Sequence, residues 1–380
     1  MNRRIVILGA SARAAACSAT HAGFVPAAAD LFGDRDLTAI AEWTRIEDYP
    51  HGAAAAAERL SAAPWIYTGG MENHPQLIDR IAPTRPLLGN PGHVLRRVRD
   101  PYLVARCLRD GGLSVPELSP AAPPPGTTDA WLRKPLRSCG GHGIRRVDLS
   151  PPRPIDADAD ADVYYQRFIP GRSYAAVYVA GGGEARLVGI TRQLTGEPWT
   201  GANPFAYCGS LGPVRFDADL TLKFERIGNR LAESFGLVGL IGVDVIVADR
   251  QVYVLEVNPR FVASIEVLER SFAGSRRLMQ EHIDACCTGL LPKNEAATPA
   301  HVTGKAILYA TRPTRIDKRF STWVERANHG ADWPPVADIP NNETQIDPGH
   351  PILTLRTEAA TPHQAVLGLR RLADLVRRCL

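Results

Sequence analysis

Short apolar runs that end in glycine-containing turns occupy the first quarter of the chain. Residues 5–8, 24–30 and 64–67 are runs of this kind, and their lengths are typical of strands. Residues 12–21 are rich in alanine, which favours a helix between the first two strands. This order of elements predicts a small α/β domain over residues 1–95.

The middle of the chain combines helical and strand-like patterns. Apolar residues recur every three or four positions after Pro101 and again before Gly236, which predicts helices over residues 102–110 and 216–235. Runs of β-branched and aromatic residues predict strands at 131–135, 163–168, 174–179 and 185–191. We therefore expect an α+β domain over residues 96–300, with one lobe at about 128–180 and a second at about 181–300.

The most apolar stretch, residues 237–261, has the pattern of a β-hairpin. Two strand-like runs, 240–247 and 252–257, flank a polar connection, and each contains one acidic residue, Asp244 or Glu256. Side chains alternate along a strand, so a three-residue loop, 249–251, would place the two carboxylates directly opposite each other. Asn258 follows Glu256 on the same face.

Carboxylates among core residues are costly unless they are paired or bound to a metal. Asp244, Glu256 and Asn258 together offer two carboxylates and an amide oxygen, a set that suits Mg²⁺ or Mn²⁺ bound alongside substrate phosphates. The alternative is a structural hairpin whose acidic side chains face solvent.

The last part of the chain, residues 301–380, predicts a β-rich cap that ends in a helix. Short strands are expected at 304–309 and 352–355. Thr361 and Pro362 form a start signal for the final helix, whose apolar residues line one face. We assign this segment no chemistry.

Composition narrows the classes of function. The chain has 380 residues, 45% hydrophobic and 22% charged, and a formal net charge of +4, which is too small for its length to indicate a nucleic-acid partner. The seven cysteines include no CxxC spacing, which favours a reducing environment over a disulfide framework. The apolar run at 5–8 is too short for a signal peptide or a membrane span. We expect a cytoplasmic protein with no membrane partner.

A glycine-rich loop follows the predicted strand 131–135. Ser138, Gly140, Gly141 and Gly143 lie just after Lys134, and residues without a Cβ let backbone amides approach phosphates closely. Taken alone, the glycines could also form only a tight turn. No GK[ST] sequence follows, so the loop is not a Walker A motif.

Two further groups are candidate substrate contacts. Ser11, Arg13, Glu72 and Asn73 follow predicted strands of the first domain, where open α/β sheets bind ligands. Capping of helices is the alternative role for Ser11 and Asn73. Loop 195–210 offers two aromatic candidates, Trp199 and Tyr207, which could instead be packed surface aromatics.

The sequence LEVNPR, preceded by an acid in the partner strand and by a lysine with a glycine-rich loop, resembles the ATP-grasp superfamily. The resemblance implies the ATP-grasp fold, with an N-terminal α/β domain and a small β-rich C-terminal cap, and it implies ATP as the nucleotide. Lys134 would contact its phosphates, and backbone groups of Arg167, Phe168 and Ile169 would meet the adenine edge. The family usually has acids where this chain has Gln166 and Ser173, and Ser173 can still hydrogen-bond the ribose.

The order of the motifs is similar to that of carboxylate–amine ligases and carboxylase-like members of this superfamily. The resemblance implies that a carboxylate attacks the γ-phosphorus of ATP to give an acylphosphate, which an amine captures with release of ADP and phosphate. Arg260 or Arg192 would stabilise the developing anion, together with Lys134. Relatives associated with genes for methanopterin- and methanofuran-type one-carbon cofactors suggest such a pathway.

Three alternatives remain at this stage: a carboxylase that uses bicarbonate, a small-molecule kinase, and a non-catalytic nucleotide-binding protein. The expected partners are a small-molecule carboxylate and an amine, and a homodimer is compatible with the resemblance.

Overall fold

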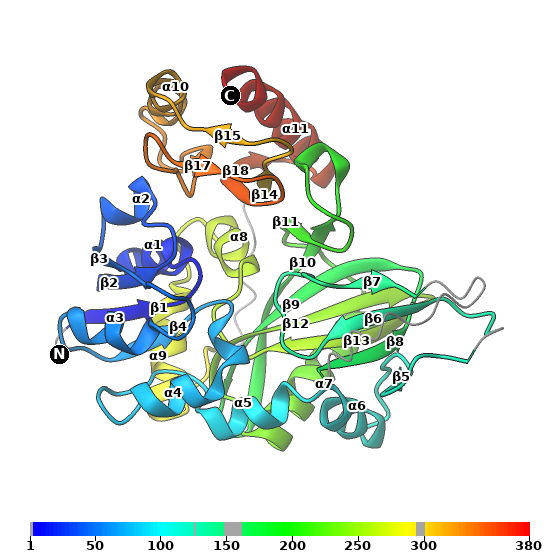
Figure 1. Cartoon of the computed structure of the whole chain (residues 1–380). Helices are drawn as coiled ribbons and strands as arrows, with labels where there is room; N and C mark the ends of the chain where they lie inside the picture. Colours follow the sequence, from blue (N-terminus) through cyan, green and yellow to red (C-terminus); the bar gives the residue numbers. More distant parts are fainter. Residues whose placement is uncertain (1–2, 125–126, 148–161, 294–300) are drawn as a thin grey trace.

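The computed structural model describes residues 3–124, 127–147, 162–293 and 301–380. Among these residues, the strands form a parallel sheet, a small antiparallel sheet, a large antiparallel sheet and a two-stranded ribbon. Figure 1 shows the N-terminal sheet beside the central sheets, with the C-terminal helices at the top of the view. No helix in the described ranges is long and apolar enough to cross a membrane.

The N-terminal α/β unit contains the three predicted strands and one that was not predicted, β3. Its sheet has the order β3-β2-β1-β4, and every pairing is parallel. The four C-terminal residues of β1 are all buried, as expected for a strand with helices on both faces. The bounds are β1 (Arg4–Leu8), α1 (Arg13–His21), β2 (Val25–Asp30), α2 (Arg35–Thr38), β3 (Glu42–Arg45), α3 (Ala53–Arg59), β4 (Trp65–Tyr67), η1 (Met71–Asn73) and α4 (Pro75–Ile81).

Two helices connect this unit to the small antiparallel sheet. Helix α5 (Gly92–Val98) leads into α6 (Pro101–Asp110), and the Asp100 side chain caps α6 by accepting from the N–H groups of Tyr102 and Leu103. The sheet has the order β5-β8-β6-β7. Its strands are β5 (Leu118–Ser119), β6 (Trp131–Pro135), β7 (Arg145–Arg146) and β8 (Val163–Arg167). Residues 136–144, between β6 and β7, are called the glycine loop below.

The large sheet has the order β13-β12-β9-β10-β11-β14-β18-β16, so it runs from the predicted metal hairpin into the C-terminal segment. Residues 301–380 are therefore not a separate β unit. Strand β9 belongs to this sheet as well, and the change from one lobe to the other falls at residues 168–171 rather than near 180. The strands are β9 (Arg172–Gly181), β10 (Glu184–Thr195), β11 (Tyr207–Gly212), β12 (Gly239–Ala248), β13 (Gln251–Asn258), β14 (Val302–Tyr309), β16 (Val336–Ala337) and β18 (Pro351–Ala359).

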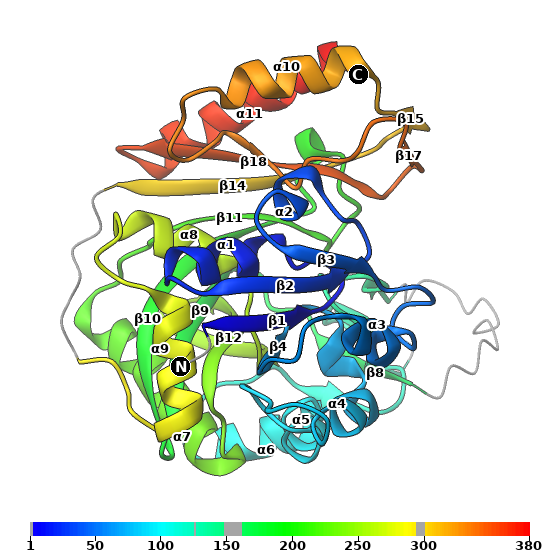
Figure 2. The ribbon, with the colours of Figure 1, turned by 90° about the vertical axis from the view of Figure 1, so that its left-hand side faces the viewer.

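Helices cover both faces of the large sheet. Helix α7 (Ala218–Phe235) is capped by Asp217 and ends at Gly236, which has a φ of 66°, and its apolar face packs into one core with residues of β9 and β12. Helices α8 (Ser264–Ser271) and α9 (Leu278–Thr288) pack with α1 and the other face of these strands, which joins the N-terminal unit to the large sheet. Figure 2 shows α8 and α9 beside the N-terminal strands.

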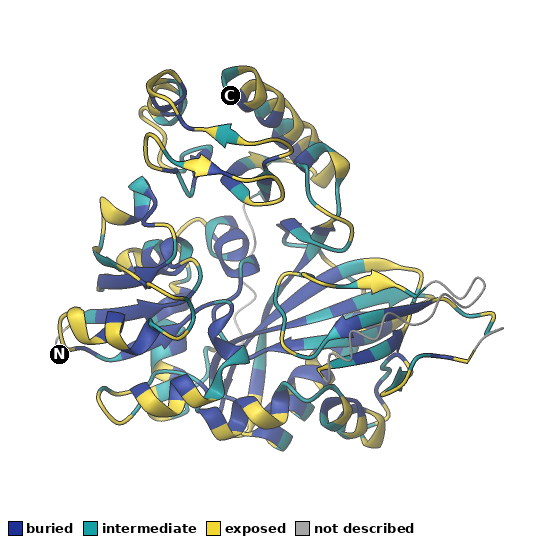
Figure 3. Ribbon diagram, in the orientation of Figure 1, coloured by how far each residue is buried: buried dark blue, intermediate teal, exposed yellow. Residues whose placement is uncertain are grey.

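The C-terminal helices form an outer layer over the last strands. Helix α10 (Lys318–Asn328) and helix α11 (Pro362–Cys379) pack against β14 and β18 in a separate core. The ribbon of β15 (Thr314–Arg315) and β17 (Gln345–Ile346) lies beside them, and η2 (Pro198–Thr200) reaches the same core through Trp199. In Figure 3 the exposed residues of both helices face outward while the central strands are buried. Thr361 caps α11 as predicted, because its hydroxyl accepts from the N–H of Gln364.

Candidate active site

The hairpin of β12 and β13 places Asp244 opposite Glu256, as predicted, but by a different route. The turn has two residues rather than three, since Ala248 pairs with Gln251. Its two residues, Asp249 and Arg250, both have positive φ angles, which a tight two-residue hairpin turn requires. A register shift between Asp244 and Val245 adds the residue that the turn lacks. This β-bulge restores the opposition of the two carboxylates.

Amide and guanidinium groups hold the two carboxylates in place. Asn258 Nδ2 donates to Asp244 Oδ2 at 3.1 Å, and Arg99 forms an ion pair with Glu256. Burial and the neighbouring charge of Glu256 raise the pKa of Asp244 to about 7. Burial by itself would also raise the pKa of Glu256, but the charges of Arg99 and Lys134 lower it below its usual value. Glu256 is thus the permanently ionised member of the pair near neutral pH.

A cavity of about 490 Å³ lies between the small sheet and the large sheet, at the predicted nucleotide site. Its wall brings together side chains from β6, β8, β13, the glycine loop and loop 195–210. Most of the predicted site residues line it: Lys134, Gly140, Gly141, Gln166, Phe168, Ile169, Ser173, Tyr207, Asp244, Glu256, Asn258 and Arg260.

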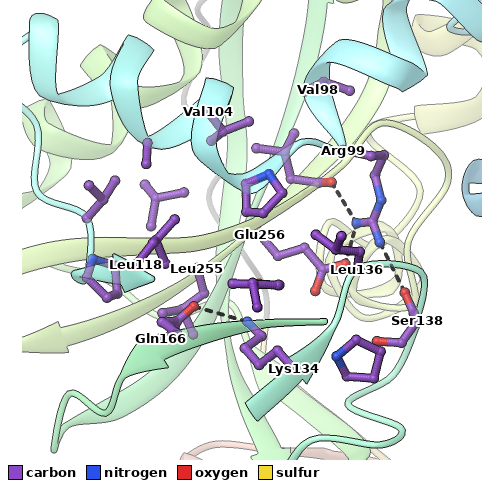
Figure 4. Close-up of a pocket in the computed structure, with 18 residues that line it drawn as sticks. Val98, Arg99, Val104, Leu118, Lys134, Leu136, Ser138, Gln166, Leu255 and Glu256 are labelled. Atoms are coloured by element: carbon purple, nitrogen blue, oxygen red, sulfur yellow. Dashed lines mark hydrogen bonds and ion pairs between the residues drawn. The ribbon is translucent and has the colours of Figure 1, made fainter. Parts of the chain in front are cut away.

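Lys134 occupies the edge of this cavity. Its ammonium donates to Gln166 Oε1 at 3.2 Å and lies 5.5 Å from the centre of the Tyr164 ring. Burial by itself would lower the pKa of Lys134, but Tyr164 and Glu256 outweigh it and the pKa is raised. The ammonium therefore stays charged, which suits contact with an anion. Figure 4 shows Lys134, Gln166 and Glu256 around a neighbouring smaller pocket of about 40 Å³.

The glycine loop is closed over the cavity. The Gly140 carbonyl accepts from the N–H of Tyr207 at 2.9 Å, and a Cβ at Gly141 would lie 2.0 Å from the Phe205 carbonyl oxygen. The Ser138 carbonyl accepts from Asn73 at 3.2 Å. Gly143 lies against Pro135 instead of the cavity, and its φ of 76° explains the glycine there.

A chain of hydrogen bonds connects Ser173 to the metal hairpin. Ser173 Oγ donates to Gln193 Oε1 at 2.7 Å, and Gln193 Nε2 donates to Asp244 Oδ1 at 2.9 Å. Gln193 was not predicted as a site residue, although it lines the cavity. Period-two alternation alone could have indicated that it and its predicted neighbour Arg192 face opposite ways.

Arg192 lies on the wrong face of β10 for the predicted role. Gln193 faces the cavity, and Thr191 on the same face bonds Ser264 at 3.0 Å. Ile190, two residues before Arg192, packs in the core that contains α7. The guanidinium therefore points to the α7 side of the sheet, and we remove Arg192 from the site.

Arg13 is committed to a buried ion network. Its side chain is 1% exposed and donates to Glu266 of α8 and to Asp338 near the C-terminal strands. These contacts use the donors of Arg13 away from the cavity, so Arg13 joins the N-terminal unit to α8 and to the C-terminal segment. Ser11 is exposed, and its carbonyl accepts from the Thr68 hydroxyl at 2.8 Å.

Two other predicted residues lie outside the cavity wall. Trp199 donates to Glu197 at 3.0 Å and packs against the C-terminal core, as the alternative interpretation of packed aromatics expects. Arg167 is exposed and paired with Asp129, and its N–H donates to Glu117 while that of Phe168 donates to Ala130. Of the three predicted adenine contacts, Ile169 is the one whose N–H has no acceptor among the described residues.

Glu72 and Asn73 of the N-terminal unit do not line the cavity, but they hold residues beside it. Glu72 is fully buried, and its Oε1 accepts from Arg260 Nε at 2.7 Å, so it orients that guanidinium. The Arg260 Nη2 also donates to Asn258 at 3.3 Å. Asn73 Oδ1 accepts from Arg99 at 3.0 Å. Arg99 was not predicted as a site residue. Its position just before the start of α6 was the only local feature of the sequence that pointed to it.

The residues present fit a hard divalent cation. Asp244, Glu256 and Asn258 offer oxygen atoms on one wall of the cavity, and their hydrogen-bond partners are amides and guanidinium groups that can rearrange. In the described part of the chain no group of three or more His, Cys, Asp and Glu side chains could hold a metal by itself. A cation here would therefore need further oxygen ligands, such as nucleotide phosphates or water.

Known proteins are similar to this chain in sequence or in fold. An uncharacterized protein of Methanocaldococcus jannaschii, MJ0776, is 22% identical over 93% of this chain and 88% of its own length. The structure is similar to an L-amino acid ligase of Bacillus licheniformis (TM-score 0.71, 14% identity, 98% of this chain and 97% of that one). It is also similar to N5-carboxyaminoimidazole ribonucleotide synthetase of Thermus thermophilus (0.68, 19%, 98% and 98%) and to a biotin carboxylase of Campylobacter jejuni (0.71, 15%, 95% and 89%).

The sequence profile of the ATP-grasp domain family matches residues 98–264, which carry the glycine loop, the cavity and the hairpin. Together with the fold over nearly the whole chain, this match confirms the resemblance predicted from the sequence: residues 98–264 are an ATP-grasp domain, and the chain has the ATP-grasp fold.

Proposed function

We propose that this protein is an ATP-dependent ligase that activates a carboxylate as an acylphosphate and joins it to an amine, with release of ADP and phosphate. The observation that carries the proposal is the cavity itself, in which two carboxylates and an amide face a buried ammonium and a glycine loop. Such a site positions and screens charge, which is the main demand of phosphoryl transfer.

Nucleotide binding is assigned to the half of the cavity nearest the small sheet. Leu132, Ile246 and Leu255 supply apolar walls for a base, and Ser173 supplies a hydroxyl for the ribose. Lys134 and the glycine loop are placed to meet the phosphates. Gln166 and Ser173 stand where acids are usual in the family, so we expect fewer charged contacts to the nucleoside.

Asp244, Glu256 and Asn258 would hold Mg²⁺, or Mn²⁺ in its place. When bound, the cation would neutralise phosphate charge and polarise the transferred phosphoryl group. Asp244 is the ligand whose protonation limits metal binding, because its pKa is about 7. Asn258 and Gln193 each donate to one of its oxygens, which fixes the orientation of the carboxylate.

The acid substrate is assigned to the side of the cavity near Arg260. In the first step a carboxylate oxygen attacks the γ-phosphorus, the bond from that phosphorus to the β,γ-bridging oxygen breaks, and ADP leaves. In the second step an amine nitrogen attacks the acyl carbon, phosphate leaves, and the nitrogen loses a proton. Arg260, held by Glu72, is placed to balance the negative charge that develops in these steps.

Oxygen-18 in the donor carboxylate tests the route. One labelled oxygen should appear in the released phosphate, because the acyl C–O bond breaks in the second step. Unlabelled phosphate would refute the acylphosphate, and release of AMP and pyrophosphate would indicate adenylation. A stable phosphorylated product would favour a kinase, and turnover with bicarbonate as the only acid would favour a carboxylase.

The finer parts of the proposal rest on the sequence resemblance. A role in making a methanopterin- or methanofuran-type cofactor is tested by including carboxylates and amines of those classes when mixtures are screened for ADP release. A cytoplasmic location is proposed because all seven cysteines are free thiols. A homodimer is proposed by analogy with the family and is tested by light scattering.

A further inference from the structure

Arg99 connects three segments that lie far apart in the sequence. It follows the last residue of α5, and its side chain is only 12% exposed. The guanidinium pairs with Glu256 and donates to the Val257 carbonyl at 3.2 Å, both on β13. It also donates to Asn73 Oδ1 at 3.0 Å and to the Ser138 carbonyl at 3.0 Å. Figure 4 shows Arg99 between Glu256 and Ser138.

The contact to Ser138 is part of a closed triangle. Asn73 Nδ2 donates to the same carbonyl at 3.2 Å, so the start of the glycine loop is held by two donors that also bind each other. Farther along the loop, the Tyr207 N–H binds the Gly140 carbonyl and gives a backbone reporter of closure. Hydrogen bonds from a charged donor are stronger than neutral ones, so Arg99 is the main holding group.

Two positively charged groups would compete for the Glu256 carboxylate. Arg99 neutralises it in the structure, whereas a divalent cation at the hairpin would use the same carboxylate and would repel the guanidinium a few ångströms away. The divalent cation carries the larger charge, so it displaces the guanidinium from Glu256 when it binds. The guanidinium then loses the carboxylate that fixes its position, and its hold on Ser138 weakens.

We propose that Arg99 is a positioning residue that couples the metal site to the glycine loop, so that metal binding at Glu256 loosens the closed loop. The proposal rests on the proposed function in taking Glu256 as a metal ligand. It adds a device that links metal occupancy, the N-terminal unit and access to the cavity. Arg99 is suited to this task because its planar guanidinium carries several N–H donors on a rigid fork that spans a wider distance than the compact ammonium of a lysine.

Hydrogen exchange of the full chain without nucleotide tests the proposal, with Mn²⁺ as the probe. In the wild type, exchange of the glycine loop and of the Tyr207 amide should accelerate by roughly tenfold when Mn²⁺ binds, the equivalent of one lost charged hydrogen bond. In Arg99→Met exchange should be fast already and insensitive to Mn²⁺. Arg97→Met is the matched control: Arg97 lies on α5, is exposed and donates to the Ser234 carbonyl, so its removal should change neither reading.

Mn²⁺ affinity distinguishes the competition between Arg99 and the metal for Glu256 from the hold of Arg99 and Asn73 on the glycine loop. Arg99→Met should bind Mn²⁺ more tightly, by about tenfold, since a competing cation is gone. Asn73→Ala should loosen the loop and raise Mn²⁺ affinity by much less than Arg99→Met does, because coupled equilibria are reciprocal but Arg99 still competes for Glu256. Arg99→Lys keeps the charge and loses the span, so it should also loosen the loop with a smaller gain in affinity, and it replaces Arg99→Met if that variant fails to fold.

The outcomes are distinguishable from failure of the proposed function. If Glu256→Gln binds Mn²⁺ as tightly as the wild type, the metal assignment itself is wrong. If Glu256 does bind the metal but the loop in Arg99→Met exchanges and responds as in the wild type, the coupling is refuted and the metal assignment stands. An equal gain in affinity in Asn73→Ala would also refute it, since general loosening would then be the cause.

Discussion

Replacement of Glu266 by Gln should destabilise the whole structure, because Glu266 is the common anion of a buried network at the junction of three segments. Its carboxylate receives Arg13 from α1, Lys305 of β14 at 2.6 Å and Arg356 of β18 at 3.1 Å. All four side chains are 6% exposed or less. The variant keeps the shape of the side chain and removes only its charge. Three cations would then share the remaining carboxylates.

The expected loss follows from burial. Removing one partner of a buried ion pair costs about 3–5 kcal/mol, since the charges left behind remain desolvated. At about 2 °C per kcal/mol for a chain of this size, the melting temperature should fall by about 6–10 °C. Glu325→Gln is the control, because its pair with Arg35 has the carboxylate 61% exposed and should contribute about 1 kcal/mol or less.

Urea denaturation at several pH values would measure this effect. Burial by itself would raise the pKa of Glu266, but Arg13 and Lys305 outweigh it and hold the pKa well below its ordinary value. A carboxyl with a depressed pKa stabilises the fold above its unfolded pKa and loses that contribution as the pH falls. The gap between wild type and Glu266→Gln should therefore be constant near neutral pH and shrink below about pH 4.5. A loss no larger than that of Glu325→Gln would refute the reasoning.

Three further predictions concern the site and its support. Gly141→Ala should open the glycine loop and raise the KM for ATP, because the new Cβ would clash with the Phe205 carbonyl. Gly140→Ala is the control: it has the same left-handed backbone but nothing within 4 Å of its Cβ, so it should cost only backbone strain of about 1 kcal/mol. Equal effects of the two substitutions would contradict the closed loop. Glu256→Gln should fold normally and lose kcat on the order of 10²-fold, and a lower melting temperature with unchanged kcat would instead make the carboxylate structural. Burial raises the pKa of Glu269 to about 7, so the folded state binds the extra proton, and stability should fall as the pH rises from about 4.5 to 7. Glu269→Gln should flatten that part of the pH profile of the melting temperature, and an unchanged profile would rule out Glu269 as its source.

Much of the site could be predicted from short stretches of sequence, because its groups lie close together along the chain. Asp244, Glu256 and Asn258 belong to one hairpin, and acids inside apolar strands are conspicuous. Lys134 and the glycine loop are likewise consecutive. For these residues the distance between partners is set by strand pairing and turn geometry, which a short stretch of sequence encodes.

The loop length shows the limit of that argument. The predicted three-residue turn was wrong, yet the carboxylates still face each other because a bulge in the strands adds one residue. Either the turn or the bulge gives the same facing pair, so the alternation of side chains could not distinguish them.

The sequence by itself determined the fold class, three of the four strands of the N-terminal unit and the hairpin with its facing carboxylates, since these follow from apolar periodicity and short-range turns. Only the tertiary structure decided the roles of Arg13, Arg192 and Arg99. Arg13 meets Glu266 across 253 positions in the sequence, and no local signal announces such a partner. Arg192 and Gln193 were equally placed until the packing of α7 fixed which face of β10 turns toward the cavity. Arg99 gained its place because α5 carries it to the point where the N-terminal unit, the glycine loop and β13 meet. Contacts of this kind depend on how whole elements pack, and the free energy of that packing is spread over cores that no single stretch of sequence contains.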